Sequence, residues 1–299
     1  MKNLIFNAFA RGEHSELNRK TKNYYECCVV SLCSARQVSP NDDIALITNT
    51  DVPDTYRQML INNDISIIKV DFDSFQFEKS MNWALAFYKL CALKYVADYL
   101  DYDNYLMVDT DTFFQGSVDD IWEETKSNIL LYATGHRISH PQVVGMRDCY
   151  KEMYQKDISL IHYGGEFFAS NRLMLQQFME KCEDVYKKMI ETKVRTTQGD
   201  EFITSIVATE DRQSIKAANA YIHRYWTGKT NIVSTNYKFD PVSILHLPSE
   251  KDAQFPLLYR YYKSRGRFPR NIHWVTCMPK ARRRPQYVMF KILAKLILH

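Results

Sequence analysis

The first 115 residues alternate between short apolar segments and segments with helical periodicity, and this alternation restricts the possible folds more than any other feature. Four apolar runs predict strands, and they fall at residues 4–9, 44–48, 65–70 and 105–108. The clearest helix comes between the last two strands, where apolar side chains recur at helical spacing over residues 81–99. Alternating strands and helices predict an α/β fold, with a mostly parallel sheet and helices on both faces.

Two aspartates follow the fourth predicted strand directly, in the run Asp109-Thr110-Asp111. Ligands of open α/β sheets bind outside the carboxyl ends of the strands, so a site is expected here. Because side chains alternate along an extended chain, Asp109 and Asp111 point to the same side and repel each other without a cation. A divalent metal ion would satisfy both carboxylates and leave coordination positions for diphosphate oxygens. The alternative is a simple turn, since Asp is common in turns.

The rest of the chain is less regular. Residues 160–169 predict a strand, and Ser170 is placed to cap the helix that follows. Residues 244–247 predict a short strand that carries His246. Residues 134–147 show little periodicity and predict a loop.

The segment from Asn104 to Thr112, with Tyr88-Lys89-Leu90-Cys91 before it, resembles the family 8 glycosyltransferases, which include glycogenin and the bacterial lipooligosaccharide α-galactosyltransferases. The resemblance implies a GT-A fold, which is a Rossmann-like sheet between helices. It also implies an enzyme that moves a hexose from a UDP-sugar to a glycan or glycolipid acceptor, with retention of configuration. An inverting transferase of a neighbouring GT-A family is the alternative.

A metal site follows from the same resemblance. In that family Mn²⁺ is held by both aspartates and by a distant histidine after an apolar pair, which here are Asp109, Asp111 and His246; Mg²⁺ is the other candidate ion. Taken alone, a histidine on a short apolar strand would be expected to be an ordinary core residue, and His136, His140 and His162 are weaker alternatives as the ligand. A basic residue before the motif contacts the donor in the family, and Lys89 matches it. The family's Gly and Lys-Pro-Trp after the histidine are missing here, so Lys251 is the candidate for phosphate contact.

Three acidic residues are candidates for catalysis. Glu166 follows Gly164 and Gly165, where the family has a donor-binding Asn-Ala-Gly segment and where glycine would let the backbone approach a ligand closely. Asp200 and Glu201 start a predicted helix, where they would bind sugar hydroxyls or act at the sugar carbon. The alternatives are a plain bulge at the glycines and simple helix capping by the two acids.

The nucleotide is expected at the ends of the first two strands, where GT-A enzymes receive it. The residues assigned to this part of the donor site are Asn7, Ala8, Phe9, Asn49, Asp51 and, within the aspartate motif, Thr110. Uridine is the base that the resemblance implies.

Charge is distributed unevenly along the chain. Residues 253–299 contain 11 Lys and Arg and no Asp or Glu, which leaves 28 of the 39 basic residues to set against all 35 acidic ones elsewhere. We therefore expect a GT-A catalytic domain at residues 1–252 and a basic, helical C-terminal appendage at residues 253–299. Such asymmetry favours an anionic surface as the partner of the appendage.

The end of the appendage, residues 280–299, combines Lys and Arg with apolar residues, and Lys291 and Lys295 are one helical turn apart. As a helix it would have one basic stripe and a wide apolar face, which is typical of a segment at an anionic membrane interface. Upstream aromatic residues would add interfacial anchors, namely Tyr259, Tyr261, Tyr262, Phe268 and Trp274. The alternative is a helix packed on the protein's own core.

Other properties bear on location. No segment has the roughly 20 consecutive apolar residues that span a bilayer, and the first residues do not form a signal peptide. The seven cysteines are scattered and lack metal-binding spacing, which favours reduced thiols. We expect a cytoplasmic protein, peripheral on the cytoplasmic face of a membrane.

Two other functions are compatible with parts of this pattern. A nucleotidyltransferase on a similar sheet would need a Gly-rich, basic loop after the first strand, and Ala10-Arg11-Gly12 is a poor one. A nucleic-acid-binding protein would use the basic tail. The body of the chain is acidic, however, so no nucleic-acid partner is expected.

Overall fold

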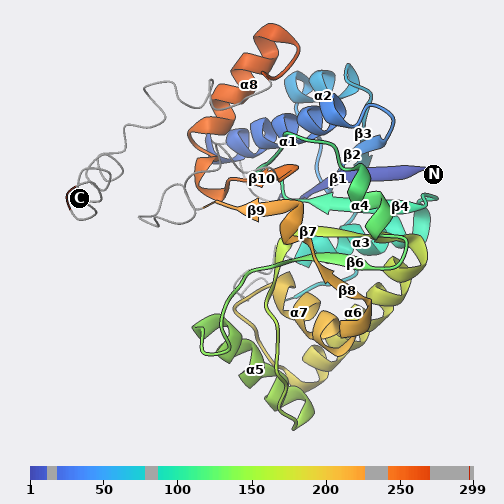
Figure 1. Cartoon of the computed structure of the whole chain (residues 1–299), viewed down its shortest axis with the longest axis vertical. Coiled ribbons are helices and arrows are strands. Elements are labelled where there is room, and N and C mark those ends of the chain that lie inside the picture. The colour runs from blue at the N-terminus through green and yellow to red at the C-terminus, as the bar shows by residue number, and fades with distance from the viewer. Residues whose placement is uncertain (12–18, 78–86, 226–241, 270–295, 297–299) are drawn as a thin grey trace.

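The computed structural model of the chain describes residues 1–11, 19–77, 87–225, 242–269 and 296 (Figure 1). Its main sheet consists of β1 (Asn3–Phe9), β2 (Asp43–Thr48), β3 (Ile65–Lys69), β4 (Asn104–Val108), β6 (Ile129–Ala133), β7 (Tyr163–Asn171) and β8 (Ile215–Ala217). The strand order is β3-β2-β1-β4-β7-β6-β8. Only β7 in this sheet runs against its neighbours, so the sheet is mostly parallel, as predicted.

A second, small sheet lies beside the first and is built from three-residue strands. It contains β5 (Thr112–Phe114), β9 (Ile222–Arg224) and β10 (Ile244–His246), with β10 in the middle. β10 pairs antiparallel with β5 and parallel with β9. Because β5 starts just after β4 ends, this pairing brings the late part of the chain to the carboxyl end of the main sheet.

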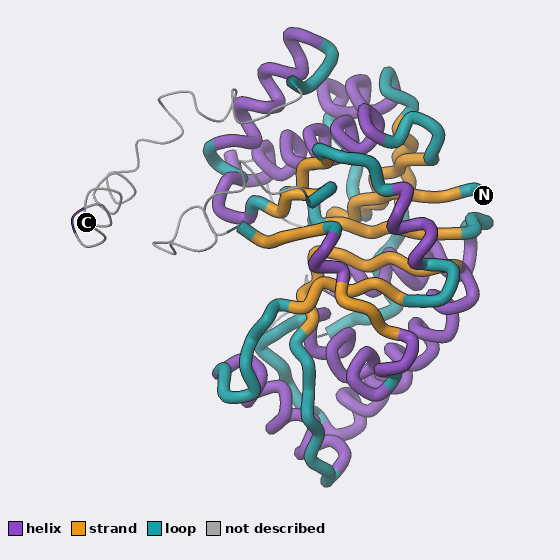
Figure 2. Tube along the Cα trace, viewed as in Figure 1, coloured by secondary structure: helices purple, strands orange, loops and turns teal. Residues whose placement is uncertain are grey.

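Helices cover both faces of the main sheet (Figures 1 and 2). On one face lie α1 (Arg19–Val38), α2 (Asp54–Ile61), α4 (Asp119–Glu124) and α8 (Gln254–Arg265). On the other lie α3 (Tyr88–Tyr99), α5 (Pro141–Tyr154), α6 (Arg172–Thr192) and α7 (Asp200–Glu210). Three short 3₁₀ helices complete the described elements, at Arg212–Ser214, Ala218–Ala220 and Pro248–Glu250.

The strands supply the core by simple alternation. In β1, Ile5 and Phe9 pack into the cluster on the α1 side, whereas Leu4, Phe6 and Ala8 pack into the cluster on the α3 side. A strand that is apolar on both faces is what a sheet covered on both sides requires. The expected helices on both faces are thus confirmed.

Two local predictions need correction. Asn171, not Ser170, caps α6, because the Asn171 side chain accepts a hydrogen bond from the Met174 amide at 3.0 Å. The predicted loop at residues 134–147 also contains the first turns of α5, which starts at Pro141 and is capped by His140. Proline at the first helical position and a capping side chain before it define this start better than periodicity does. Of the helix predicted over residues 81–99, residues 81–86 lie outside the described residues.

The predicted C-terminal appendage begins inside the core. Tyr259 and Tyr262 of α8 are each 6% exposed and Phe268 is 3% exposed, so their assignment as membrane anchors is wrong. Tyr262 stacks on Phe268 and donates a hydrogen bond to Asn63. Most of the predicted membrane segment, residues 280–295 and 297–299, lies outside the described residues, as does Trp274.

Within the described residues, no helix is both long enough and apolar enough to cross a membrane. The six cysteines that the structure describes are free thiols, and five of them are buried.

Candidate metal and donor-binding site

The aspartate motif occupies the turn between the two sheets. Asp109 follows the last residue of β4, and Asp111 precedes the first residue of β5. The turn is held firmly, since the Asp109 amide donates to the Glu166 carbonyl at 3.0 Å and the Thr112 hydroxyl donates to the Asp109 carbonyl at 2.7 Å. The Asn7 side-chain amide also donates to the carbonyls of Val108 and Asp109, at 2.9 and 3.3 Å.

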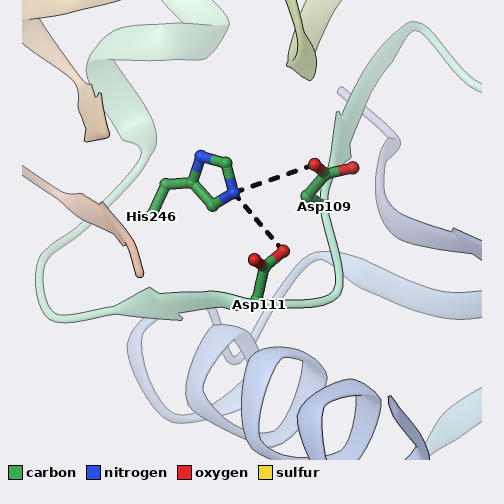
Figure 3. Close-up of side chains that lie close together, drawn as sticks. All are labelled: Asp109, Asp111 and His246. Atoms are coloured by element: carbon green, nitrogen blue, oxygen red, sulfur yellow. Dashed lines mark ion pairs between the residues drawn. The ribbon is translucent and has the colours of Figure 1, made fainter. Parts of the chain in front are cut away.

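His246 reaches the two aspartates through the small sheet. The register of β10 places His246 opposite Thr112, and the Leu247 amide donates to the Asp111 carbonyl at 3.0 Å. His246 Nε2 lies 3.4 Å from Asp111 Oδ1 and 3.8 Å from Asp109 Oδ2 (Figure 3). One ligand atom from each of the three residues lies within 4.8 Å of the others. The predicted metal ligands are therefore brought together.

The donor set fits a divalent cation. His246 Nε2 and Asp111 Oδ2 are buried and have no hydrogen-bond partner, which is costly unless something binds them. Lys251 Nζ lies 3.1 Å from Asp111 Oδ2 but without hydrogen-bond geometry. Two carboxylates and one imidazole suit Mn²⁺, with Mg²⁺ favouring the carboxylates alone.

Without a metal, the three groups compensate one another electrostatically. Burial lowers the pKa of His246, but the charge of Asp111 and a contact with Glu166 outweigh burial and raise the pKa to about 9. Burial works the other way on Asp111, yet His246 and Lys251 bring the pKa of Asp111 below its usual range. The metal-free His246 is thus a cation at neutral pH, and a metal ion would have to displace its proton.

Two lysines flank the motif. Lys89 on α3 lies 2.6 Å from Asp109 Oδ1 and donates to the Gly165 carbonyl at 3.0 Å. Burial opposes its charge, but Asp109 and Asp200 raise the pKa of Lys89 well above its usual value. The pKa of Lys251 is also raised, because Asp111 outweighs the effect of burial. Both lysines are cations beside the expected position of a diphosphate.

Glu166 and Glu201 are both held by ion pairs. Arg224 binds both oxygens of Glu166 at 2.5 Å, and its Nη2 lies 3.4 Å from Glu201 Oε1. The other Glu201 oxygen lies 2.8 Å from His162 Nε2. Burial raises the pKa of Glu166, but His246 and Arg224 outweigh it and lower the pKa to about 2. Both predicted catalytic glutamates are therefore ionised and already paired.

Asp200 is different from these glutamates. The residue is 4% exposed, and burial raises the pKa of Asp200 to about 7 in spite of the nearby Lys89. It lies against Gly165, where an added Cβ would be 2.3 Å from Asp200 Oδ2. At Gly164 an added Cβ would be 1.9 Å from Glu166 Oε2. The two glycines thus make room for the acidic side chains of the site itself.

The residues predicted to bind the nucleotide divide into two groups. Asn7 donates to the Asp109 carbonyl in the aspartate turn. Asn49 makes two hydrogen bonds with the backbone of Arg11, just after β1. Ala8 and Phe9 are buried in the two core clusters. The Asp51 side chain is 91% exposed and pairs with Lys69, and its assignment to the nucleotide stays a prediction. Thr110 is buried between the two aspartates.

Arg224 is a residue of the site that the sequence did not indicate. It lies on β9, directly across from His246 on β10, and links Glu166 to Glu201. A lone arginine on a three-residue strand has no sequence signal of its own. His162, a weaker alternative to His246 in the sequence, contacts Glu201 instead and lies 2.9 Å from His136 through the Nδ1 atoms.

No protein-family model matches the sequence, and no curated protein is found to be similar to it. Solved structures are similar in fold. The apo form of mouse xyloside xylosyltransferase 1 superposes with a TM-score of 0.55 and 9% identity, over 84% of this chain and 99% of that one. An active-site mutant of LgtC gives 0.53 at 13% identity, and galactosyltransferase LgtC with donor and acceptor sugar analogs gives 0.52 at 14%. Each LgtC match covers 82% of this chain and 87% of LgtC.

Identities this low establish the fold and nothing finer. The expectation drawn from the aspartate motif is confirmed at that level: the chain has the GT-A fold that these glycosyltransferases share.

Proposed function

We propose that the protein is a metal-dependent glycosyltransferase that moves a hexose from a UDP-sugar to a glycan or glycolipid acceptor, with retention. The observation that supports it best is the buried cluster of Asp109, Asp111 and His246 at the carboxyl end of β4 in a GT-A fold. Two lysines beside this cluster match the charge of a diphosphate.

The cluster would hold Mn²⁺ or Mg²⁺ through one oxygen of each aspartate and through His246 Nε2. When bound, the ion supplies positive charge that stabilises the departing nucleoside diphosphate. Lys89 and Lys251 would contact the phosphates, because each is already placed beside one aspartate. A phosphate oxygen at this position would accept a charge-assisted hydrogen bond from a lysine that already lies beside an aspartate.

Asp200 is the group that we assign to the donor sugar. Glu166 and Glu201 are held in close ion pairs, whereas Asp200 lies beside the backbone of Gly165 with a raised pKa. With a pKa near 7, Asp200 can donate a hydrogen bond to a sugar hydroxyl as the acid, or accept one from it as the carboxylate. Glu201, paired with Arg224 and His162, would orient this end of α7. Asn7 and Asn49 are assigned to the nucleotide.

We also propose that the protein works on the cytoplasmic face of a membrane. The support is the acid-free, basic composition of residues 253–299 and the mixture of basic and apolar residues at 280–299. A glycolipid or a membrane-linked polysaccharide would be presented at such a surface.

The test is hydrolysis of a panel of nucleotide-sugars with and without Mn²⁺. The wild-type protein is compared with the double variant Asp109→Asn, Asp111→Asn and with the control Asp119→Asn, Asp120→Asn, which removes two exposed acids from α4. Metal-dependent release of nucleoside diphosphate from one donor, lost in the first variant and kept in the control, is the expected result. The anomeric configuration of the released or transferred sugar, read by NMR, decides retention.

Two outcomes would contradict the proposal. If no donor is cleaved and none binds with metal, the aspartates do not form a donor site. If a sugar phosphate and a nucleoside triphosphate yield pyrophosphate instead, the protein is a nucleotidyltransferase on the same fold.

A further inference from the structure

A buried carboxylate lies behind the predicted metal ligand His246. Glu166 is 1% exposed, and its Oε1 is 3.3 Å from His246 Nδ1. The opposite ring nitrogen, Nε2, is the one that lies near Asp109 and Asp111. Glu166 is not one of the three grouped ligands, but it contacts the other ring nitrogen, whose protonation determines the tautomer of His246.

Glu166 is itself held in place. Arg224 binds both of its oxygens at 2.5 Å, and the register of the small sheet sets Arg224 beside His246. The absence of a side chain at Gly164 is necessary for this arrangement, because an added Cβ would lie 1.9 Å from Glu166 Oε2 and 2.5 Å from Arg224 Nη2. The contact between Glu166 and the His246 ring thus depends on residues from three strands, β7, β9 and β10.

We propose that Glu166, fixed by Arg224, is a positioning residue of the metal centre. It accepts the Nδ1–H of His246, which fixes the ring and leaves Nε2 unprotonated and aimed at the metal. A carboxylate behind a ligating histidine also makes the histidine a stronger ligand, and its loss commonly weakens metal binding about 10- to 100-fold. The assignment rests on the metal centre of the proposed function, but not on the identity of the donor or the reaction.

The Arg224 guanidinium also contacts a second acidic residue of the site. Arg224 Nη2 also contacts Glu201, which accepts the Gly165 amide at 3.3 Å and neighbours Asp200 on α7. The group that fixes the metal ligand thereby also fixes the backbone next to the acid assigned to the donor sugar. Changes at Arg224 should therefore affect both metal binding and donor binding.

The first experiment measures Mn²⁺ affinity by titration calorimetry in the absence of any nucleotide-sugar. Glu166→Gln keeps the size of the side chain but removes its charge and one of the two acceptors for Arg224, and we expect roughly 10- to 100-fold weaker binding. Arg224→Lys keeps the charge but cannot bind both oxygens in a fork, so it should weaken binding in the same direction. Glu26→Gln is the matched control, since Glu26 is also buried, at 5% exposure, but pairs with Lys22.

A merely structural role would lower the melting temperature of Glu166→Gln without changing Mn²⁺ affinity at a temperature where the variant is folded. Affinity within about twofold of wild type would overturn the proposal, as would absence of Mn²⁺ binding by the wild-type protein. Failure of every nucleotide-sugar to react would overturn the proposed function and leave this assignment intact, because the metal titration needs no donor.

A second measurement needs no substitution at Glu166 and covers the case in which that variant does not fold. Nitrogen-15 NMR of labelled histidines in the wild-type protein with diamagnetic Mg²⁺ reports the tautomer of His246, assigned against His246→Gln. The Nδ1–H tautomer is expected. A proton on Nε2 in the metal-loaded protein would overturn the proposal.

Discussion

The partners of each buried acid decide how it behaves. Asp111, Glu166 and Asp200 are all at least 96% buried, and burial alone would raise the pKa of each. Contacts with His246, Lys251 and Arg224 reverse this effect at Asp111 and Glu166, whereas Lys89 only partly opposes it at Asp200. Two of the acids are therefore fixed as anions, and the third changes its charge near neutral pH.

Replacing Asp200 should remove a loss of stability that the wild-type protein undergoes as pH rises through 7. The pKa of Asp200 is about 7 in the folded protein against an ordinary value of 3.8. Between these values the folded state binds the extra proton, so this group stabilises the fold fully below pH 3.8 and loses that contribution as pH rises through 7. Asp200→Asn removes the dependence. Relative to wild type, its free energy of unfolding should be higher at pH 8 than at pH 5 by on the order of 2 kcal/mol.

Urea denaturation of both proteins at pH 5 and pH 8 measures this difference directly. An equal stability difference at the two pH values would show that Asp200 keeps its ordinary pKa in the folded protein. The variant should also release less nucleoside diphosphate, because Asp200 is assigned to the donor sugar.

Element ends, more than element interiors, build the site. Asp109 follows the last residue of β4, His246 is the last residue of β10, and Asp200 is the first residue of α7. β7 enters the site near its start, at Glu166, because it runs against the other strands of the main sheet. Three-residue strands such as β10 have little pairing of their own, so their register depends on the neighbours that hold them.

The far end of β7 offers a test of how these elements are fixed. Asn171 caps α6 by accepting from the Met174 amide and donates to the Thr125 carbonyl at 2.8 Å. Asn171→Ala should cost about 1–2 kcal/mol of stability, since it removes a helix cap and the hydrogen bonds to the Thr125 and Lys126 carbonyls. Leu173→Ala, in the first turn of the same helix and 63% exposed, should cost about 0.5 kcal/mol or less. Chemical denaturation of the two variants compares them, and an equal cost would mean that the cap contributes nothing.

At the scale of the whole molecule, two hydrophobic clusters lie on opposite faces of the main sheet. α8 completes the cluster on the α1 side through buried residues that recur at helical spacing, namely Phe255, Leu258, Tyr259 and Tyr262. The exposed side of the same helix carries Arg260, Lys263 and Arg265, so the solvent-facing surface of α8 is basic. The core therefore continues past residue 252, and α8 is part of it.

Two truncations separate folding from membrane binding. A protein ending at residue 279 keeps α8 and should melt like the full chain, but it should lose binding to anionic vesicles, because six Lys and Arg near a membrane contribute on the order of 1 kcal/mol each. A protein ending at residue 252 loses α8 and should not fold stably. Vesicle co-sedimentation with anionic and with neutral lipid provides the measurement and its control. Undiminished binding after truncation at residue 279 would contradict the membrane proposal.

The sequence predicts the first half of the fold well because its signals are local. Strands β1 to β4 are continuous apolar runs between helical segments, and the two aspartates stand where an α/β sheet binds ligands. His246 is identified by an apolar pair before it and by the family resemblance, not by any local physical signal. Its partner Glu166 is recognisable as an acid beside two glycines, and the bulge considered for those glycines is present, since the pairing of β6 with β7 shifts register there. The place of Glu166 behind the imidazole also depends on β10, 80 residues later, and this contact the sequence does not reveal.

The parts that sequence reasoning misses depend on contacts between distant segments. Arg224 acts through contacts with Glu166, 58 residues earlier, and with Glu201, 23 residues earlier, so its role cannot be recognised from its neighbours in the sequence. α8 has a usable signal, since its apolar residues recur at positions i, i+3, i+4 and i+7. The basic residues between these apolar positions make the same helix resemble a membrane-binding segment, which is why a place in the core is not predicted.

The order in which the chain is made gives the split site a consequence during synthesis. Asp111 and His246 are 135 residues apart in the sequence, so at typical rates about 7 to 27 s pass between the synthesis of the two. During that time β4 and its neighbours can form and Lys89 can pair with Asp109, but neither His246 nor Lys251 is yet present beside Asp111. The newly made N-terminal half thus has an incomplete cation site, and the site closes only when β10 inserts between β5 and β9.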